Sequence, residues 1–330
     1  MRALELRAYD GRPESFAVID RPDPHPGPGQ VLVRVAASPI NPSDLAFLNG
    51  LYGFKKPLPT IPGFEGSGTV IESGPGLMSR YLKGKRVACT AADPKISGGM
   101  WAEYVVTSAQ LCIPLDDKMN LDQAAMMLVN PITAWAMVDE ARRANDRALV
   151  QTAAASALGR MIIRLCKRFQ MPLINVVRRA EQVELLKREG SEHVLNSEDP
   201  GFDSALRELA RGLGASLALD AVAGELTGRV LRAQPKQSRM LIYGALSMSA
   251  AQVDPGSLVF EGKKVEGFWL SQWLAQQSFP KKILLSRRIQ RLLDSDLRSD
   301  IRAKVPLEQA AAAIREYASN MTAGKILITP

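Results

Sequence analysis

Residues 147–179 constrain the fold of this chain more than any other stretch. Apolar runs at 147–151 and 173–177 have the composition of buried parallel strands. Between them, apolar residues recur at helical spacing over 158–170, after a turn made of very small residues. The order strand, tight turn, helix, strand predicts a βαβ unit. In a dinucleotide-binding unit, small turn residues let backbone N–H groups and the helix N-terminus approach the pyrophosphate.

The glycine fingerprint of such a turn is incomplete in this chain. Where G-x-G-x-x-G is expected, the chain carries Ala153, Ser156 and Gly159. An ordinary βαβ unit with an alanine-rich helix start therefore stays open as the alternative.

Two arginines after the second strand favour a nucleotide. NAD-binding units usually carry an acidic residue about 20 positions downstream, where it binds the ribose 2′-hydroxyl. This chain has Arg178 and Arg179 at that place. A guanidinium grips phosphate oxygens bidentately, so arginines there suit a 2′-phosphate. We predict NADPH as the cofactor, with two solvated arginines as the alternative.

Length and composition indicate a globular protein of about two domains. The 330 residues are 46% hydrophobic and 23% charged. No apolar run reaches the roughly 20 residues of a membrane span, and the N-terminus lacks an apolar signal core. We therefore expect a cytoplasmic protein without membrane contact; a removed organellar presequence is the alternative. The three cysteines stand singly and are typical of small core residues.

Strand and helix signals divide the chain into two parts. Residues 1–40 are short runs of alternating apolar and polar residues between turns, which predicts a small all-β unit. The glycines of 58–70 indicate that the backbone there passes close to another part of the structure or to a ligand. After the βαβ unit, strands and helices alternate, which predicts a doubly wound parallel sheet. The expected strands lie at 193–196, 216–222, 239–243 and 264–269, and the expected helices at 181–189, 204–211, 226–233, 279–294 and 307–319.

Several motifs give the chain a family resemblance over nearly its full length. The motifs Asn41-Pro-Ser-Asp44, Gly50-Leu-Tyr52, Pro62-Gly-Phe-Glu-Gly-Ser-Gly68 and Thr322-Ala-Gly-Lys325-Ile resemble those of zinc-free medium-chain dehydrogenases/reductases, including quinone oxidoreductases. Three narrower ones, Val129-Asn130-Pro131-Ile-Thr133-Ala134, Asn175-Val-Val-Arg178-Arg179 and Phe268-Trp269-Leu-Ser-Gln-Trp273, resemble mitochondrial-type trans-2-enoyl-thioester reductases. Those enzymes use NADPH to saturate enoyl groups on CoA or acyl carrier protein.

The resemblance implies an α/β fold with two domains. Residues 1–118, completed by 271–330, would form a GroES-like β-rich catalytic domain. Residues 119–270 would form a Rossmann domain, a doubly wound parallel sheet that binds NADPH.

The same resemblance implies a set of site residues. Tyr52 would be the proton donor, and Asn41, Trp269 and Trp273 would line a substrate pocket. The implied NADPH-lining residues are Asn130, Ala155, Ser156, Ala157, Leu158, Arg178, Arg179, Tyr243, Gly244, Ala245, Leu246, Phe268, Trp269, Leu270, Ser271 and Lys325. From the residues alone, a packing role for Tyr52 and a core or interface role for the tryptophans stay open.

Two positions depart from the family pattern. The family commonly has Asn-Ser-Gly-Val where this chain has 155–158, and a further basic residue where Ala180 stands. The second departure implies weaker binding of a 2′-phosphate.

We predict no zinc. A catalytic zinc needs thiolate and imidazole ligands, and a structural zinc lobe needs closely spaced cysteines. Phe64 stands where zinc-dependent members place a histidine. The two histidines, His25 and His193, have no cysteine at ligand spacing, which favours surface or packing roles.

The leading functional hypothesis is NADPH-dependent reduction of the activated C=C bond of a 2-enoyl thioester. The alternatives are a quinone or other enone reductase on the same fold and a non-catalytic nucleotide- or RNA-binding relative. The net charge of +8 is spread along the chain without the aromatic-interleaved clusters of single-strand binders, so we expect no nucleic-acid partner. The expected partners are a small or carrier-bound acyl substrate and a second copy in a homodimer.

Overall fold

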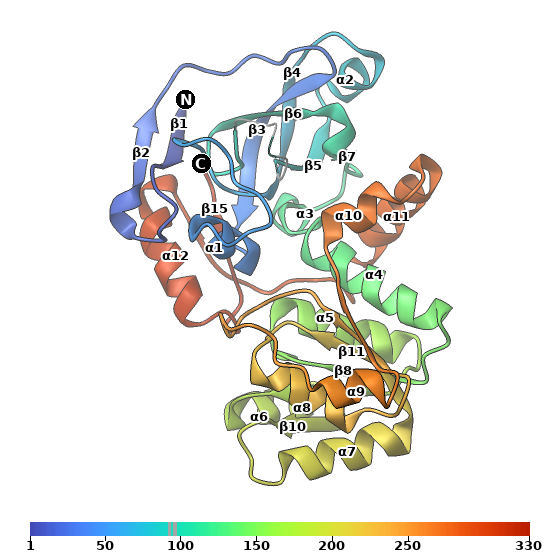
Figure 1. Cartoon of the computed structure of the whole chain (residues 1–330). Helices are drawn as coiled ribbons and strands as arrows, with labels where there is room; N and C mark the ends of the chain where they lie inside the picture. The colour runs from blue at the N-terminus through green and yellow to red at the C-terminus, as the bar shows by residue number, and fades with distance from the viewer. Residues whose placement is uncertain (92–93, 95–97) are drawn as a thin grey trace. The chain divides into compact units, whose positions relative to one another are not determined.

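The computed structural model describes residues 1–91, 94 and 98–330 (Figure 1). Contacts divide the chain into two compact units. Unit 1 comprises Met1–Pro131 and Leu284–Pro330, and unit 2 comprises Ile132–Ile283. Two helices, α4 (Asn130–Arg143) and α11 (Phe279–Leu292), run across the unit boundaries. None of the helices among the described residues has the length and apolar character needed to cross a bilayer.

Unit 1 is built on a mainly antiparallel sheet. In the described part of the chain this sheet has seven strands, with the order β14-β15-β3-β4-β5-β7 and with β6 paired to β3; β1 and β2 form a separate antiparallel pair. The strands are β1 (Arg2–Leu6), β2 (Phe16–Asp20), β3 (Gln30–Pro39), β4 (Glu65–Ser73), β5 (Arg86–Thr90), β6 (Tyr104–Ser108), β7 (Cys112–Pro114), β14 (Ile301–Val305) and β15 (Lys325–Ile328). The helices are α1 (Pro42–Leu48), α2 (Leu77–Leu82), α3 (Leu121–Ala125) and α12 (Ala310–Ser319), with short 3-10 turns η1 (Pro13–Ser15), η2 (Ala109–Leu111) and η3 (Leu307–Gln309).

The glycines of β4 explain the glycine-rich stretch of the sequence. β4 pairs with β3, and Gly68 lies opposite Val35. A Cβ atom on Gly68 would lie 2.1 Å from the carbonyl oxygen of Arg34, a distance that real Cβ contacts do not reach. The glycine-rich stretch therefore needs small residues because its backbone passes close to strand β3.

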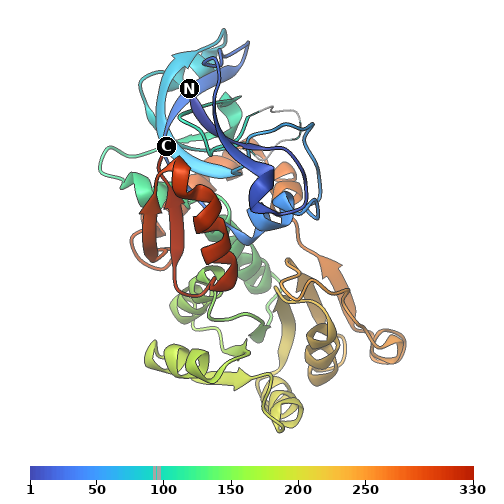
Figure 2. The same ribbon diagram turned by 90° about the vertical axis from the view of Figure 1, so that its left-hand side faces the viewer.

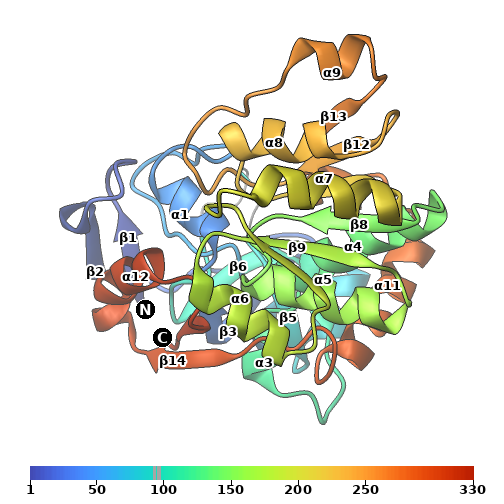
Figure 3. The same ribbon diagram turned by 90° about the horizontal axis from the view of Figure 1, so that it is seen from below.

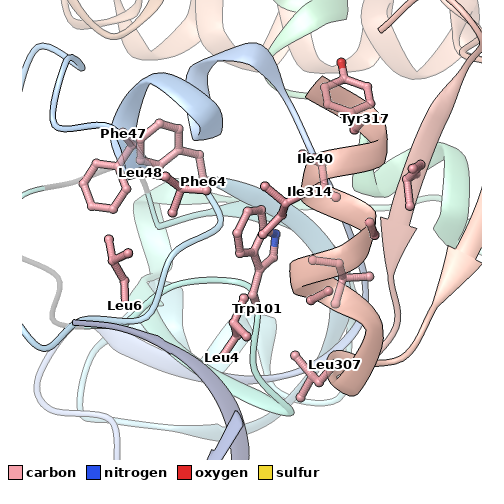
Figure 4. Packing of buried hydrophobic residues seen from close by; sticks show 14 residues of the cluster. Leu4, Leu6, Ile40, Phe47, Leu48, Phe64, Trp101, Leu307, Ile314 and Tyr317 are labelled. Atoms are coloured by element: carbon pink, nitrogen blue, oxygen red, sulfur yellow. The ribbon is translucent and has the colours of Figure 1, made fainter. Parts of the chain in front are cut away.

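The core of unit 1 joins the first and last parts of the chain. Figure 4 shows Trp101 between Leu4 and Ile314, with Phe47 and Phe64 nearby; all five are buried. α12, which carries Ile314, packs beside β15 (Figure 2). The C-terminal segment therefore completes the hydrophobic core that the N-terminal strands begin.

Unit 2 is a doubly wound α/β unit, as the sequence predicts. In the part of the chain that the structure describes, its six parallel strands have the order β10-β9-β8-β11-β12-β13. Numbered from β8, this is the 3-2-1-4-5-6 order of dinucleotide-binding folds, in which the direction of winding reverses at the first strand. The strands are β8 (Ala148–Gln151), β9 (Leu173–Val177), β10 (His193–Asn196), β11 (Ala215–Asp220), β12 (Arg239–Ile242) and β13 (Lys264–Gly267), and the helices within the unit are α5 (Ala157–Arg168), α6 (Ala180–Arg188), α7 (Phe202–Leu213), α8 (Glu225–Ala233), α9 (Pro255–Val259) and α10 (Leu270–Ala275).

Helices cover both faces of this sheet. α7 and α8 lie side by side on one face (Figure 3). Their residues Phe202, Leu206 and Val230 pack against buried residues of the strands. Right-handed crossovers place α5 and α6 on the opposite face. The central strands β8 and β9 are buried along their whole length because both of their faces are covered, whereas the edge strand β13 is largely exposed.

Candidate active site

The turn between β8 and α5 has the features of a pyrophosphate-binding turn. Ala153 has φ 49°, a left-handed conformation that usually falls to glycine. A Cβ on Gly159 would lie 2.4 Å from the carbonyl oxygen of Ala154, so only glycine lets α5 pack this closely on the turn. Ser156 caps the helix by accepting a hydrogen bond from Gly159 N at 3.1 Å. The N–H groups of the first turn of α5 point out of the helix and suit an anion.

The predicted cofactor residues of unit 2 gather at one edge of its sheet. Residues 155–158 follow β8, Arg178 follows β9, residues 243–246 follow β12 and residues 268–271 follow β13. All these strands are parallel, so their carboxyl ends share one edge. In open α/β sheets ligands bind at this edge, where the winding reverses.

Asp220 fixes the backbone at this edge. Its buried carboxylate accepts hydrogen bonds from the hydroxyls of Thr152 and Thr227, each at 2.7 Å, and from Val222 N at 2.9 Å. Thr152 is the first residue after strand β8, and Val222 lies in the loop after strand β11. The Asp220 carboxylate therefore holds two neighbouring loops together. The sequence reasoning missed Asp220; an acid at the end of an otherwise apolar strand was the available signal.

Tyr243 has a buried hydroxyl that needs a partner. That oxygen has no hydrogen-bond partner in the described part of the chain. Burial, reinforced by the negative charge of Asp220, raises the pKa of Tyr243 well above its usual value, so the phenol remains protonated. A buried donor without a partner costs free energy, and a polar group of a bound cofactor would supply that partner.

The two arginines after β9 differ in their surroundings. Arg178 is exposed, and the structure records no ion pair for it among the described residues. Arg179 already pairs with Glu181, with Nε 3.1 Å from the carboxylate. Arg178 is therefore the better-placed ligand for a 2′-phosphate. The small-residue turn, the unpartnered Tyr243 hydroxyl and Arg178 together fit a phosphorylated dinucleotide.

A buried polar cluster within unit 1 contains two of the predicted site residues, Asn41 and Lys325. Asn41 donates from Nδ2 to Glu65 Oε1 at 2.9 Å, and its Oδ1 accepts from Lys325 Nζ. Lys325 also donates to the carbonyl of Ile40 at 3.2 Å, although 284 positions separate it from Asn41. Both Asn41 and Lys325 are residues that the resemblance implied.

Glu65 connects this cluster to the start of α4. Its Oε2 accepts hydrogen bonds from Leu128 N at 2.8 Å and Val129 N at 2.9 Å, directly before the predicted cofactor residue Asn130. Burial raises the pKa of Glu65, while the Val129 N–H, Asn41 and the Lys325 charge oppose the rise. Glu65 thus fixes the backbone from which Asn130 begins its helix. The sequence reasoning did not assign this role, although a lone acid in a glycine-rich strand was a signal.

Asp44 is the second buried acid of the cluster. Its carboxylate accepts from Asn41 N at 2.8 Å and from Phe64 N at 3.1 Å. Burial, with the nearby charge of Glu65 adding to it, raises the pKa of Asp44 to about 7. The cluster therefore holds one acid that changes protonation near neutral pH.

Tyr52 packs against aromatic side chains of unit 1. Its half-buried ring is 4.6 Å from the Phe64 ring and 5.2 Å from the Phe54 ring, measured between centroids. These contacts hold the ring on the polypeptide that follows α1. They are compatible with a positioned phenol and with a purely packing residue.

The tryptophan motif lies at the end of β13. Trp269 occupies the N-cap position of α10 and is 43% exposed. Trp273 lies within that helix. The rings of Phe268 and Trp273 are 6.5 Å apart. These residues are therefore surface-accessible aromatic groups and not part of the unit 2 core.

Among the described residues, no group of three or more His, Cys, Asp and Glu side chains is arranged to hold a metal ion. His25 is exposed beside Glu72, with 3.6 Å between Nδ1 and the carboxylate, and His193 opens β10. Cys89, Cys112 and Cys166 are buried and free.

Comparison with known proteins agrees with this architecture. Residues 27–117 match the family model of the alcohol dehydrogenase GroES-like domain, and residues 157–286 match that of the zinc-binding dehydrogenases. A mitochondrial enoyl-[acyl-carrier-protein] reductase of Caenorhabditis elegans is 32% identical over 259 residues, covering 76% of this chain and 72% of the relative.

Solved structures agree over the whole length. A Mesorhizobium loti protein assigned as an NADPH:quinone reductase is 37% identical, with a TM-score of 0.91, covering 100% of this chain and 98% of its own. A Bacillus thuringiensis protein with the same assignment is 29% identical, with a TM-score of 0.87 and the same coverage.

Proposed function

Because the chain belongs to the medium-chain dehydrogenase/reductase family of oxidoreductases, we propose that it uses NADPH to reduce the activated C=C bond of a 2-enoyl thioester. The thioester would be carried on CoA or on an acyl carrier protein. The observation that carries the proposal is the similarity to an enoyl-[acyl-carrier-protein] reductase at 32% identity over 76% of the chain.

The residues at the carboxyl edge of unit 2 would hold NADPH. The turn of residues 153–159 would receive the pyrophosphate, Arg178 the 2′-phosphate, and the Tyr243 hydroxyl a polar group of the cofactor. Bound NADPH supplies the hydride. The other residues implied by the resemblance, including Asn130 and Lys325, keep their proposed place in the cofactor site.

Tyr52 would supply the proton. Hydride addition at the β-carbon of an enoyl thioester leaves negative charge on the carbonyl oxygen and an α-carbon that must be protonated. An unperturbed phenol has a pKa of about 10 and is protonated at neutral pH, so it can act as a general acid. The contacts of the Tyr52 ring with Phe54 and Phe64 would fix the direction of its hydroxyl.

The proposed substrate pocket includes Asn41, Trp269 and Trp273. Both ends of the Asn41 amide are engaged by Glu65 and Lys325, so Asn41 would shape the pocket wall and not hydrogen-bond the substrate. The exposed ring of Trp269 would offer an apolar surface to an acyl chain. In domain terms, residues 1–118 with 271–330 would be catalytic and residues 119–270 would bind NADPH.

Quinone reduction is the second candidate function. The Mesorhizobium loti and Bacillus thuringiensis structures, assigned as NADPH:quinone reductases, align over the full chain. Two-electron reduction of a quinone needs no dedicated proton donor, because its oxygens take protons from water.

A substrate panel separates the two candidates. NADPH oxidation would be followed with crotonyl-CoA, longer enoyl-CoA esters and benzoquinone-type acceptors. We expect kcat/KM to be higher for an enoyl-CoA than for any quinone. Turnover of quinones alone would reject the enoyl proposal, and no turnover with NADPH of any acceptor would reject the oxidoreductase assignment.

A further inference from the structure

Unit 2 carries a pocket away from the predicted cofactor edge. Its volume is about 360 Å³, and three arginines from two helices line it: Arg207 and Arg211 of α7 and Arg232 of α8. α7 ends just before β11 begins, and α8 ends just before β12 begins. The pocket therefore lies towards the amino ends of these strands, whereas the predicted cofactor residues follow the carboxyl ends.

The three arginines carry positive charge that the two acids of the pocket lining balance only in part. No side-chain ion pair or side-chain hydrogen bond is recorded for their guanidinium groups with any described residue, although the charge of Arg211 contributes to the lowered pKa of Glu261. Arg207 and Arg211 are four positions apart on one helix, where like charges repel. An anion bound among the three guanidinium groups would remove this repulsion.

The two acids in the pocket lining are already engaged. Asp254 caps α9 by accepting from Gly256 N at 3.3 Å and Ser257 N at 3.2 Å. Glu261 pairs with Lys263 at 2.7 Å, and this contact lowers the pKa of Glu261. Glu261 therefore interacts mainly with Lys263 and more weakly with Arg211, and neither acid forms an ion pair with the three arginines.

An aromatic ring completes the lining. Phe260 is 82% exposed, an unusual degree for a large apolar side chain that lines a pocket. A flat apolar group can stack on this ring while an attached anion lies against the arginines.

We propose that this pocket binds a small phosphate ester with a flat apolar portion, its phosphate on Arg207, Arg211 and Arg232 and its ring on Phe260. Guanidinium groups match phosphate geometry bidentately, and a phosphate dianion balances more of their charge than a carboxylate does. The site is separate from the cofactor turn and stands whether or not the chain reduces enoyl thioesters.

Calorimetric titration with phenyl phosphate tests the proposal. The protein would be held in saturating NADPH, so that the phosphate sites of the cofactor edge are filled. We expect binding that weakens with added salt and that drops about tenfold or more in Arg207→Gln and in Arg232→Gln. Arg188→Gln, which removes an exposed arginine from α6, is the matched control and should bind as the unmodified protein does.

Two further arms test the assigned chemistry. Phe260→Ala should weaken phenyl phosphate while leaving the affinity for inorganic phosphate unchanged. Benzoate, which keeps the ring and replaces the phosphate, should bind more weakly than phenyl phosphate. The proposal is overturned by equal binding of benzoate, by no binding of phenyl phosphate at millimolar concentration, or by equal loss of binding in the Arg188→Gln control.

Discussion

At the scale of single residues, Tyr52 decides between the two candidate reactions. Tyr52→Phe removes the phenolic proton and keeps the ring that packs on Phe54 and Phe64, so folding and NADPH affinity should change little. A positioned general acid contributes on the order of 10²–10⁴-fold, and kcat for enoyl-CoA should fall by about that much. Steady-state kinetics of both proteins with enoyl-CoA and with a quinone measures the effect.

Quinone reduction serves as the internal control for Tyr52, because it draws its protons from water and should survive the substitution. If both activities persist at full rate in Tyr52→Phe, the tyrosine is a packing residue and the proposed proton transfer is wrong.

The two arginines after β9 should contribute unequally to cofactor choice. Arg178→Ala should weaken NADPH binding about tenfold or more and leave NADH unchanged, since a hydrogen bond to a charged group contributes roughly 1.5–3 kcal/mol. Arg179→Ala should have a smaller effect, because Arg179 already pairs with Glu181. Glu181→Gln should release Arg179 and tighten NADPH modestly. Fluorescence titration with both nucleotides measures this; equal NADH and NADPH affinities in the unmodified protein would refute the 2′-phosphate assignment.

At the scale of elements, helix α1 carries a pH-dependent cap. Asp44 lies in the first turn of this helix and accepts a hydrogen bond from the backbone N–H of Asn41. This hydrogen bond is one half of a capping box. Its pKa is about 7 in the folded protein against an unfolded value of 3.8. The folded state therefore binds more protons between these values, so this group's contribution to stability is present below about pH 4 and is lost as pH rises to about 7.

Asp44→Asn tests this dependence. The Asn side chain cannot titrate, and it replaces one of the two oxygens that accept hydrogen bonds from the backbone N–H groups of Asn41 and Phe64. The variant should therefore be less stable than the unmodified protein at acidic pH. The difference should shrink as pH rises through about 7, by a free energy on the order of 4 kcal/mol at most. Urea unfolding across this pH range provides the measurement. Parallel stability profiles would show that Asp44 does not titrate in this window.

Helix α11 offers a basic face to an anionic substrate. It contains five basic residues and no acidic one, and Lys281, Arg287 and Arg291 are exposed. If the acyl group arrives on an acidic carrier protein, Arg287→Glu with Arg291→Glu should raise KM, mainly by slowing association, and high salt should reduce the effect. Arg188→Glu on α6 is the charge-matched control. An unchanged KM would make this helix ordinary solvated surface.

Elements that local pattern determines were predictable from the sequence. The expected strand 173–177 has the bounds of β9, because an apolar run covered on both faces is distinctive. The expected strand 193–196 has the bounds of β10, whose four residues are half-buried. β14, α9 and α10 were not expected. The helices α9 and α10 have only five and six residues, which is too short for helical periodicity to be recognised. β14 has five residues in which apolar and basic side chains alternate, so its strand pattern was present in the sequence and was missed.

The candidate site divides in the same way. The shared carboxyl edge of unit 2 follows from a parallel sheet, which the strand–helix alternation of the sequence predicts, whereas the order of the strands along the sheet comes from the structure. The cluster of Asn41, Glu65 and Lys325 depends on contacts between segments hundreds of positions apart, which no local pattern contains. Asp44 and Glu65 were part of quoted motifs, but their burial and their partners became evident only from the structure.

At the scale of the whole molecule, the edge strand β13 predicts a homodimer. It pairs with β12 on one side, its residues are largely exposed, and no other described strand pairs with it. An exposed edge presents unpaired backbone groups to another chain, and pairing with a second copy of itself across a two-fold axis would close it. Light scattering at micromolar concentration should therefore give twice the chain mass of 35.9 kDa.

The hydrogen-bond pattern of β13 shows how to test that pairing. Lys264 N and Phe268 N donate to carbonyls of Ser238 and Ile242, on the β12 side. Backbone groups alternate in direction along a strand, so Val265 N–H points away from β12. Val265→Pro should remove this outward donor, spare the β12 pairing and yield monomers, whereas Val265→Ala keeps the donor and should stay dimeric. A dimeric mass for Val265→Pro would place the interface elsewhere, and a monomeric mass for the unmodified protein would rule out the dimer.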